Sequence, residues 1–344
     1  MKININEIAR RAGVSIATVS RALNNSQAIN KETQKKILEI AEEYNYKPNP
    51  IARSLSKQRT ETVGVVLSDM NSEFFTEIIR GIDDEALRAN YFLMVSTIQN
   101  QRNLNETFSE FMDSGRVDGI ILMADMLHRD ILSIIKKSEK PVILLNAAPV
   151  VGDYICFNIN FFQGTMAVID HLYDHGHRII SFIAGPQDIY RFDELLRGYE
   201  TALRNHEIPI RENFMIKSRN SLQSGYNAFM RLAHYIEDID AIFCANDLLA
   251  AGAYEAAQSL NIRIPQDVAI VGFDNQKFSQ HMVPRLTTVH LPFYELGSKA
   301  MQYMLKMIDR NVPQKQRFKE ELSPGLVIGG SCGWHEWSYR SGLQ

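Results

Sequence analysis

The stretch AGVSIATVSRALN, from Ala12 to Asn24, predicts a tight turn followed by a short helix. Gly13 is the residue type that most often ends a helix, and Ser15 is a strong N-cap for the next one. At 100° per residue, Val19 and Leu23 share an inward face. The opposite face carries small or hydrogen-bonding side chains: Ala17, Ser20, Arg21 and Asn24. This second face is either a solvated helix surface or a surface that contacts a partner.

Two further helices are predicted around this one. Asn4 is a good N-cap for a helix over Ile5–Ala12, and Asn30 or Lys31 opens a third helix that ends near Tyr44. Apolar side chains at helical spacing supply one small core: Ile8, Val14, Val19, Leu23, Ile37 and Ala41. Two helices joined by a tight glycine turn form a helix-turn-helix, whose second helix meets base edges in the DNA major groove. A long cation such as Arg21 can bind guanine O6 and N7 there.

The charge of the chain is divided unevenly. Residues 1–60 carry 11 Lys and Arg against 5 Glu, whereas the remaining 284 residues carry 26 basic and 35 acidic side chains. A basic head on an acidic body is typical of a small polyanion-binding module joined to a domain with another task. The 344 residues are enough for two or three domains, and 45% hydrophobic side chains is a globular composition.

The sequence carries no sign of export or membrane insertion. Its first residues lack an apolar leader, and its longest apolar runs are far shorter than the ~20 residues of a membrane span. The cysteines, Cys156, Cys244 and Cys332, are scattered and odd in number, which favours reduced thiols. We therefore expect a cytoplasmic protein without a membrane partner.

The segment KPNPIARSLSKQRTE, from Lys47 to Glu61, predicts a marginal helix. Asn49 is a good N-cap and Pro50 suits the first helical position, but a helix that ends near Ser56 is too short to be stable alone in water. Such a basic segment could fold on DNA and insert Leu55 into the minor groove. The alternative is a plain linker.

From Thr62 onward, short β-rich runs alternate with helical stretches. TVGVVLSD (62–69) and VDGIILMA (117–124) belong to a first series, and RIISFIAG (178–185), AIFCAND (241–247) and DVAIVGFDN (267–275) belong to a second. Strands that alternate with helices indicate parallel sheets covered on both faces. We predict an all-α helix-turn-helix head and an α/β body of two doubly wound parallel-sheet lobes. Ligands of such sheets bind beyond the carboxyl ends of the strands.

The motifs as a group resemble the LacI/GalR family of bacterial transcription regulators. NEIARRAGVSIATVSRALN and INKETQKKILEIAEEYNYKPNPIARSLSKQRT resemble the DNA-binding head of that family. VGVVLSDMNSEFFTEIIRGID, HLYDHGHRIISFIAGP, CANDLLAAGAY and IPQDVAIVGFDN resemble its body, which is similar to periplasmic sugar-binding proteins. The resemblance implies that Ile16, Ala17 and Arg21 contact bases, that Ser15, Thr18 and Ser20 largely contact phosphates, and that Leu55 is the wedge. It moves Ile16, which helical spacing assigns to the core, onto DNA. Asn24, Asn49 and Ala52 complete the expected DNA-contacting set.

The same resemblance divides the chain and places an effector site. It implies a head over residues 1–48, a hinge over 49–61, a first lobe over 62–160 and about 292–323, and a second lobe over 161–291 and about 324–344. Residues expected to line the cleft between the lobes are Asp69, Phe74, Phe75, Asn146, Arg191, Phe243, Asn246 and Asp274. Carboxylate and amide groups bind hydroxyls, and aromatic faces stack on a sugar ring. For each Phe alone, core packing is the competing interpretation.

Three positions depart from the family pattern. Leu195 occupies the place of a usual Arg, Asn146 that of a usual Asp, and Phe161 that of a usual Asn. Arg191 lies near enough to reach the cleft from the preceding loop. We therefore expect a small polar, sugar-like effector, but not one whose recognition can be copied from relatives.

No chemistry beyond binding is expected. His171, His175 and His177 have a spacing that could hold a metal, yet no further ligand clusters near them, and we expect neither metal nor cofactor. No catalytic motif is present. The predicted function is an effector-responsive repressor of carbohydrate or related catabolic genes that binds pseudo-palindromic operator DNA as a homodimer. The alternatives are a ligand-binding receptor and a sugar-modifying enzyme built on the same body.

Overall fold

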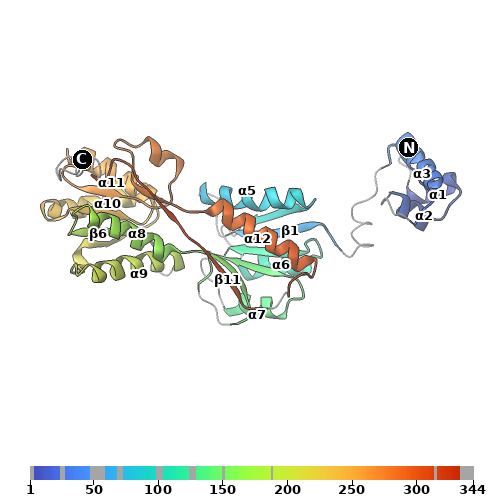
Figure 1. The fold of residues 1–344 in the computed structure, drawn as a ribbon, viewed down its shortest axis with the longest axis horizontal. Coiled ribbons are helices and arrows are strands. Elements are labelled where there is room, and N and C mark those ends of the chain that lie inside the picture. Colours follow the sequence, from blue (N-terminus) through green and yellow to red (C-terminus); the bar gives the residue numbers. More distant parts are fainter. Residues whose placement is uncertain are drawn as a thin grey trace. The chain divides into compact units, whose positions relative to one another are not determined.

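The computed structural model describes residues 4–23, 28–46, 59–67, 73–97, 104–123, 129–148, 152–186, 189–313 and 316–333. Two compact units are present, Met1–Glu61 and Thr62–Gln344, called here the head and the body (Figure 1). Several residues predicted to bind DNA or effector lie outside the described residues: Asn24, Asn49, Ala52, Leu55 and Asp69.

The head consists of the three predicted helices, α1 (Ile5–Ala12), α2 (Ile16–Leu23) and α3 (Lys31–Glu43). The Asn4 side chain accepts a hydrogen bond from the Glu7 amide, as expected of an N-cap. Gly13 ends α1 with φ 72°, a left-handed conformation that glycine adopts without a steric cost.

The core of the head differs from the prediction at Val14 and Leu23, which pack against it but are only partly buried. Its buried side chains are Ile8, Ala9, Ala12, Val19, Ala22, Ile37 and Ala41. Leu23, which was expected to face inward with Val19, is only partly buried, because α2 turns Ala22 toward the core instead. The Lys36 ammonium donates to the Ala12 carbonyl at 3.1 Å and so ties α3 to the turn before α2.

The first lobe of the body is built on six parallel strands in the order β11-β5-β4-β3-β1-β2. The strands are β1 (Thr62–Leu67), β2 (Phe92–Thr97), β3 (Gly119–Met123), β4 (Val142–Leu145), β5 (Ile155–Ile159) and β11 (Phe318–Leu322). The helices are α5 (Glu73–Arg88), α6 (Leu104–Asp113), α7 (Arg129–Lys137) and α12 (Phe293–Ile308). Strands β3, β4 and β5 are buried along their whole length, as their continuous apolar sequences require.

The second lobe contains four parallel strands in the order β7-β6-β8-β9. They are β6 (Ile180–Ala184), β7 (Met215–Lys217), β8 (Ala241–Cys244) and β9 (Ala269–Val271). Its helices are α8 (Phe161–Asp174), α9 (Tyr190–Asn205), α10 (Leu222–Leu232) and α11 (Asp247–Ser259). An antiparallel pair, β10 (Thr288–His290) and β12 (Gly325–Val327), lies beside this sheet through the bridge between Val271 and Thr287. No described helix has the length and apolarity required to span a membrane.

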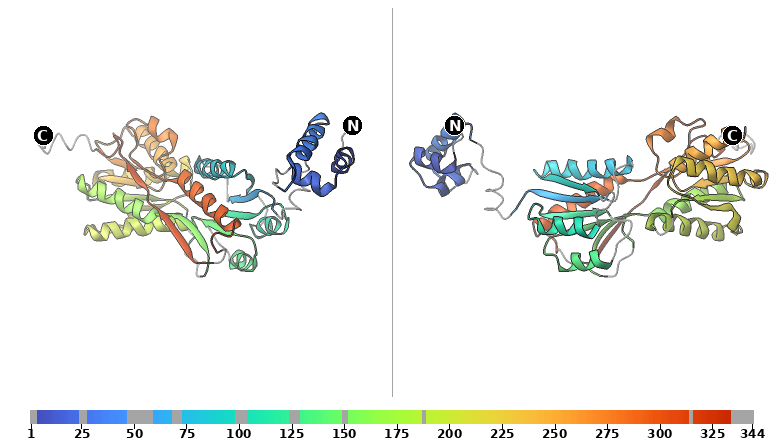
Figure 2. Two further views of the ribbon diagram at one scale, coloured as in Figure 1. Left: turned by 45° about the vertical axis from the view of Figure 1, so that its right-hand side comes forward. Right: turned by 180° about the vertical axis from the view of Figure 1, so that it is seen from behind.

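The chain passes between the lobes three times (Figure 2). The passages follow β5, β10 and β11. As a result α12, which is more than 200 residues from α5 in the sequence, packs against it in the first lobe. Two glycines permit this contact: a Cβ on Gly81 would lie 2.1 Å from the Tyr294 carbonyl oxygen, and a Cβ on Gly297 would lie 2.2 Å from the Ile78 carbonyl oxygen.

Substitution of Gly297 tests this contact. Gly297→Ala should lower the free energy of unfolding of the body by about 1–3 kcal/mol, because the new methyl group meets backbone that cannot rotate away. Gly325→Ala is the matched control, since its Cβ would meet nothing within 4 Å. Urea unfolding of both variants checks the prediction, and equal stability of the two would contradict it.

Candidate functional site

The exposed face of α2 carries the side chains expected to contact DNA. Ser15, Ile16, Ala17 and Arg21 are exposed, and Thr18 and Ser20 are half-buried. Ile16 is 50% exposed, so the core position that helical spacing alone assigned to it is wrong. The Ser15 hydroxyl also accepts from the Thr18 amide at 3.2 Å, which makes it the cap of α2.

Arg21 differs from the neighbouring arginines of the head in its partners. Glu7 accepts hydrogen bonds from Arg10 at 2.7 Å and from Arg11 at 2.8 Å, and these bonds lower the pKa of Glu7 to about 2. Arg21, by contrast, has no ion pair with any residue in the described part of the head. Its guanidinium is therefore available to an external acceptor.

Two residues predicted to line the cleft form a buried ion pair, and one of them, Asp274, lines a cavity of the body. Arg191, the second residue of α9, donates from Nη2 to Oδ1 of Asp274, which follows β9. The two side chains are only 12% and 5% exposed. Burial raises the pKa of Asp274 to about 6, although Arg191 opposes the shift. Asp274 and Arg191 were both predicted to line the cleft, and the structure brings them into direct contact.

A cavity of about 310 Å³ opens next to this pair. Phe74 at the start of α5 forms one wall, the segment 274–277 after β9 forms another, and the passage from His290 to Glu295 forms a third. Residues from both lobes therefore line one cavity beyond the carboxyl ends of the strands, where open α/β sheets place their ligands.

Two predicted cleft residues have structural partners. Asn246 is buried and caps α11 by accepting from the Leu249 amide at 2.8 Å, while its amide group donates to Asn220 at 2.7 Å. Asn146 is buried and accepts from the Ile159 amide at 2.9 Å, which joins the ends of β4 and β5.

Two of the predicted aromatic residues lie in the core. Phe243 is completely buried within β8 and stacks on Phe182, with ring centroids 5.0 Å apart. Phe75 is 3% exposed and belongs to the main hydrophobic core. The parallel strands and α5 enclose both rings, which agrees with the competing interpretation of core packing, and their contact with an effector stays a prediction.

Comparison with known proteins assigns the family. Residues 4–49 match the model for bacterial regulatory proteins of the lacI family, and residues 169–332 match that for a periplasmic binding protein-like domain. The chain is 33% identical over 325 residues to the probable HTH-type transcriptional repressor ExuR of Bacillus subtilis (strain 168), with 92% of this chain and 95% of that protein covered. The chain belongs to the LacI family. It is a DNA-binding transcriptional regulator, as the sequence motifs predicted.

Two solved structures of LacI-family proteins have the same fold. The Lac repressor dimer bound to operator and the anti-inducer ONPF superposes with a TM-score of 0.86 at 24% identity, over 96% of this chain and 99% of that chain. A LacI family regulator from Enterococcus faecium with bound ribose superposes with a TM-score of 0.68 at 26% identity, over 78% and 98%. The predicted fold class is confirmed. Because the relatives are named regulators, the receptor and enzyme alternatives lose their support.

Sequence reasoning missed one carboxylate of this LacI-family regulator. Asp247, the first residue of α11, is completely buried and accepts from the Gln276 amide at 2.7 Å and from the Thr288 hydroxyl at 2.5 Å. It thereby holds the segment that carries Asp274. Burial, and then the charge of Asp274, raise the pKa of Asp247 to about 7. An acidic residue after an N-cap asparagine usually indicates only a favourable helix start, so the pattern gave no sign of this contact.

The histidine cluster has structural partners as well. His171 Nε2 lies 3.3 Å from Cys332 Sγ, and His177 Nε2 lies 3.1 Å from the Cys332 carbonyl oxygen. Burial lowers the pKa of His171 to about 4 and keeps its ring neutral. Among the residues that the structure describes, no three His, Cys, Asp or Glu side chains are grouped to hold a metal.

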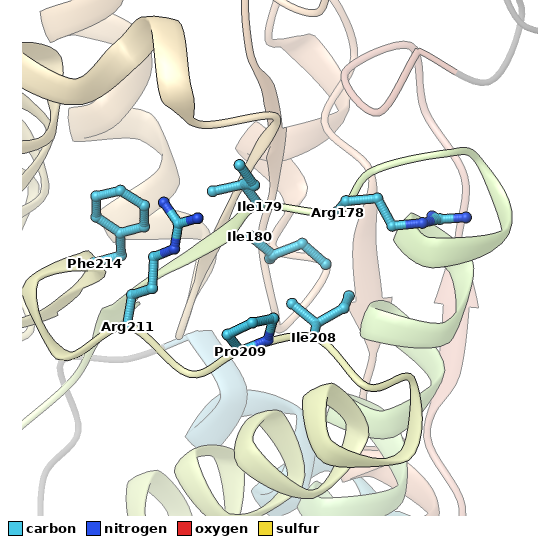
Figure 3. A pocket seen from close by; sticks show the side chains of 7 residues that line it. All are labelled: Arg178, Ile179, Ile180, Ile208, Pro209, Arg211 and Phe214. Carbon is cyan, nitrogen blue, oxygen red and sulfur yellow. The ribbon is translucent and has the colours of Figure 1, made fainter.

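A second cavity of about 210 Å³ lies at the opposite end of the second sheet, beside the start of β6 (Figure 3). Its lining is largely apolar and includes Ile180, Ile208 and Phe214. Figure 3 shows the Arg178 side chain extending away from these residues; its guanidinium lies 3.8 Å from the Tyr173 ring centroid. This cavity contains none of the residues predicted to bind an effector.

The raised pKa of Asp247 predicts a pH effect on stability. The folded body retains a proton that the unfolded chain releases near its ordinary pKa of 3.8, so the contribution of Asp247 to stability falls as pH rises from about 4 to about 7. Asp247→Asn keeps both hydrogen bonds, because the Thr288 hydroxyl can reverse its role. Its stability relative to the unsubstituted protein should increase by roughly 1–3 kcal/mol over that range.

The matched control is Asp267→Asn. Arg263 lowers the pKa of Asp267 to about 2, so this substitution should leave the pH dependence above pH ~4.5 unchanged. Chemical denaturation at several pH values measures both variants. A pH profile of Asp247→Asn parallel to that of the unsubstituted protein would show that Asp247 is ionised throughout.

Proposed function

We propose that this regulator binds a pseudo-palindromic operator as a homodimer, with α2 of each copy in the major groove. Ile16, Ala17 and Arg21 would contact bases, and Ser15, Thr18 and Ser20 would contact phosphates. The observation that carries this proposal is Arg21, which is exposed and has no ion pair with the described residues of the head. The Lac repressor, whose fold this chain shares, has been solved as a dimer on its operator.

Four further residues of the first unit complete the proposed interface. Asn24, Asn49 and Ala52 would add DNA contacts, and Leu55 would insert into the minor groove at the centre of the operator. These four roles rest on the family resemblance, since the residues lie outside the described part of the chain. We also propose the division of the chain that the resemblance implies. It consists of a head over 1–48, a hinge over 49–61, a first lobe over 62–160 and about 292–323, and a second lobe over 161–291 and about 324–344.

We infer that the cavity between the lobes binds a small polar, sugar-like effector. Asp274, Asn275 and Phe74 in its lining combine hydrogen-bonding groups with an aromatic face. The family member from Enterococcus faecium was solved with ribose, which supports this class of ligand. Effector binding would shift the relative positions of the lobes and thereby change DNA affinity. The genes controlled would be carbohydrate or related catabolic genes, and the protein would act as a repressor in the cytoplasm.

Substitution of Arg21 tests the DNA proposal. An operator is first selected from random DNA with the unsubstituted protein. Arg21→Ala should then weaken specific binding by about 10-fold or more per half-site, because a bidentate arginine–guanine contact contributes about 1–3 kcal/mol. Binding to unrelated DNA should change much less. Fluorescence anisotropy with both DNAs measures the difference.

Lys35→Ala provides the control for charge. Lys35 is exposed on α3, so the variant loses the same positive charge from another face of the head. It should reduce operator binding and nonspecific binding by similar factors. If Arg21→Ala behaved like Lys35→Ala on the selected operator, α2 would not be the recognition helix.

A ligand screen tests the effector proposal. A sugar that binds the cavity should raise the melting temperature of the body by mass action and should change the affinity for the selected operator. Thermal shift with pentoses, hexoses and nucleobases, followed by anisotropy for every ligand that stabilises, provides both measurements. Stabilisation by nucleobases alone would overturn the sugar-like assignment.

A further inference from the structure

Asp274 lines the cavity and is also bonded to Arg191. Arg191 reaches it from α9, which belongs to the same lobe, and donates to Asp274 Oδ1 and, at 3.5 Å, to the Ala245 carbonyl. Both acceptors are supplied by the protein itself. The guanidinium therefore has a tethered carboxylate at the position that the carboxylate or phosphate of a ligand would otherwise take.

The aromatic side chains around Arg191 make it costly to replace Asp274 by another anion. The guanidinium carbon of Arg191 lies 5.5 Å from the ring centroid of Phe161, 5.4 Å from that of Phe192 and 5.9 Å from that of Phe273. These rings exclude water from both members of the pair. In such a site, removing the partner of a buried charge costs much more free energy than removing the partner of an exposed charge. An anionic ligand that took the place of Asp274 on Arg191 would leave that carboxyl buried without its partner, either charged or protonated.

Carboxylates outnumber cationic groups in the lining of the adjoining cavity. Glu77, Asp274 and Glu295 supply carboxylates to its lining, and Lys277, which is exposed, supplies an ammonium. Oδ1 of Asn275 is buried without a donor among the described residues. A hydroxyl group of a ligand can donate to Asn275 Oδ1 and to the carboxylates of the lining, whereas a negative charge would be repelled by those carboxylates.

We propose that Asp274 is a built-in counter-ion for Arg191 that makes the cleft select uncharged polyhydroxylated effectors and reject sugar acids and sugar phosphates. The role is one of specificity: the same residue neutralises the arginine and accepts from ligand hydroxyls. This inference rests on the proposed effector site, and it adds the charge class of the ligand.

The test removes the counter-ion and asks whether an anion replaces it. Asp274→Asn is the variant of choice, because asparagine has the size and shape of the aspartate that already adopts φ 121° here, and it keeps an acceptor oxygen. Inorganic phosphate at millimolar concentration, matched with sodium chloride for ionic strength, should raise the melting temperature of this variant by about 2–4 °C. It should leave the unsubstituted protein unchanged.

The double variant Arg191→Gln/Asp274→Asn is the matched control, and it should lose the response to phosphate. If Asp274→Asn fails to fold, Asp274→Gly serves in its place, because glycine adopts the same backbone conformation. Matched neutral and acidic ligands, D-glucose with D-glucuronate and D-ribose with ribose 5-phosphate, are run alongside on the unsubstituted full chain.

The outcomes separate this inference from the proposed function. Phosphate stabilisation of Asp274→Asn alone supports the counter-ion role, even if no sugar changes operator affinity and the effector proposal fails. Stabilisation of the unsubstituted protein by phosphate, glucuronate or ribose 5-phosphate that Arg191→Gln abolishes would overturn the inference and leave a sugar-like effector standing. Absence of any phosphate response in Asp274→Asn and Asp274→Gly would also overturn it.

Discussion

The body is organised around the cost of burying charge at the carboxyl ends of its second sheet. The side chains of Arg191 and Asp274 are almost completely buried, and each charge is stabilised there by the other. Aromatic rings around the guanidinium strengthen this dependence by keeping water out. Whatever enters the neighbouring cavity therefore meets an arginine whose charge is already balanced by Asp274.

A second buried carboxylate fixes the geometry of the first. Asp247 joins the start of α11 to the segment after β9 and to β10, so three elements from different parts of the chain converge on one side chain. Gly272 is part of the same arrangement, because a Cβ there would lie 2.3 Å from an Asp247 carboxylate oxygen. The position of Asp274 is thus set by a polar contact beneath it. Burial and the charge of Asp274 raise the pKa of Asp247, and the hydrogen bonds from Thr288 and Gln276 oppose that rise.

Local patterns predicted much of this molecule, and long-range packing decided the rest. Caps at Asn4 and Gly13 act within one turn, so the helices of the head could be placed from the sequence. The apolar runs of the body are local patterns too, and they predicted the parallel strands. The side-chain roles of Phe243 and Asp247 depend on neighbours far away in the chain, and no spacing rule contains that information. The prediction for Ile16 lies between these two cases. Periodicity alone assigned it to the core, and the family resemblance correctly moved it to the exposed face.

Because the chain passes between the lobes repeatedly, both lobes complete their folding late in synthesis. β11 completes the first sheet and β12 pairs with β10 beside the second, so each lobe contains strands from residues 318–327. Neither lobe can close its strand pairing until the ribosome has produced those residues, whereas the contacts of the head lie within the first unit of the chain. A ribosome that stops early therefore releases a finished DNA-reading surface without a closed body to control it.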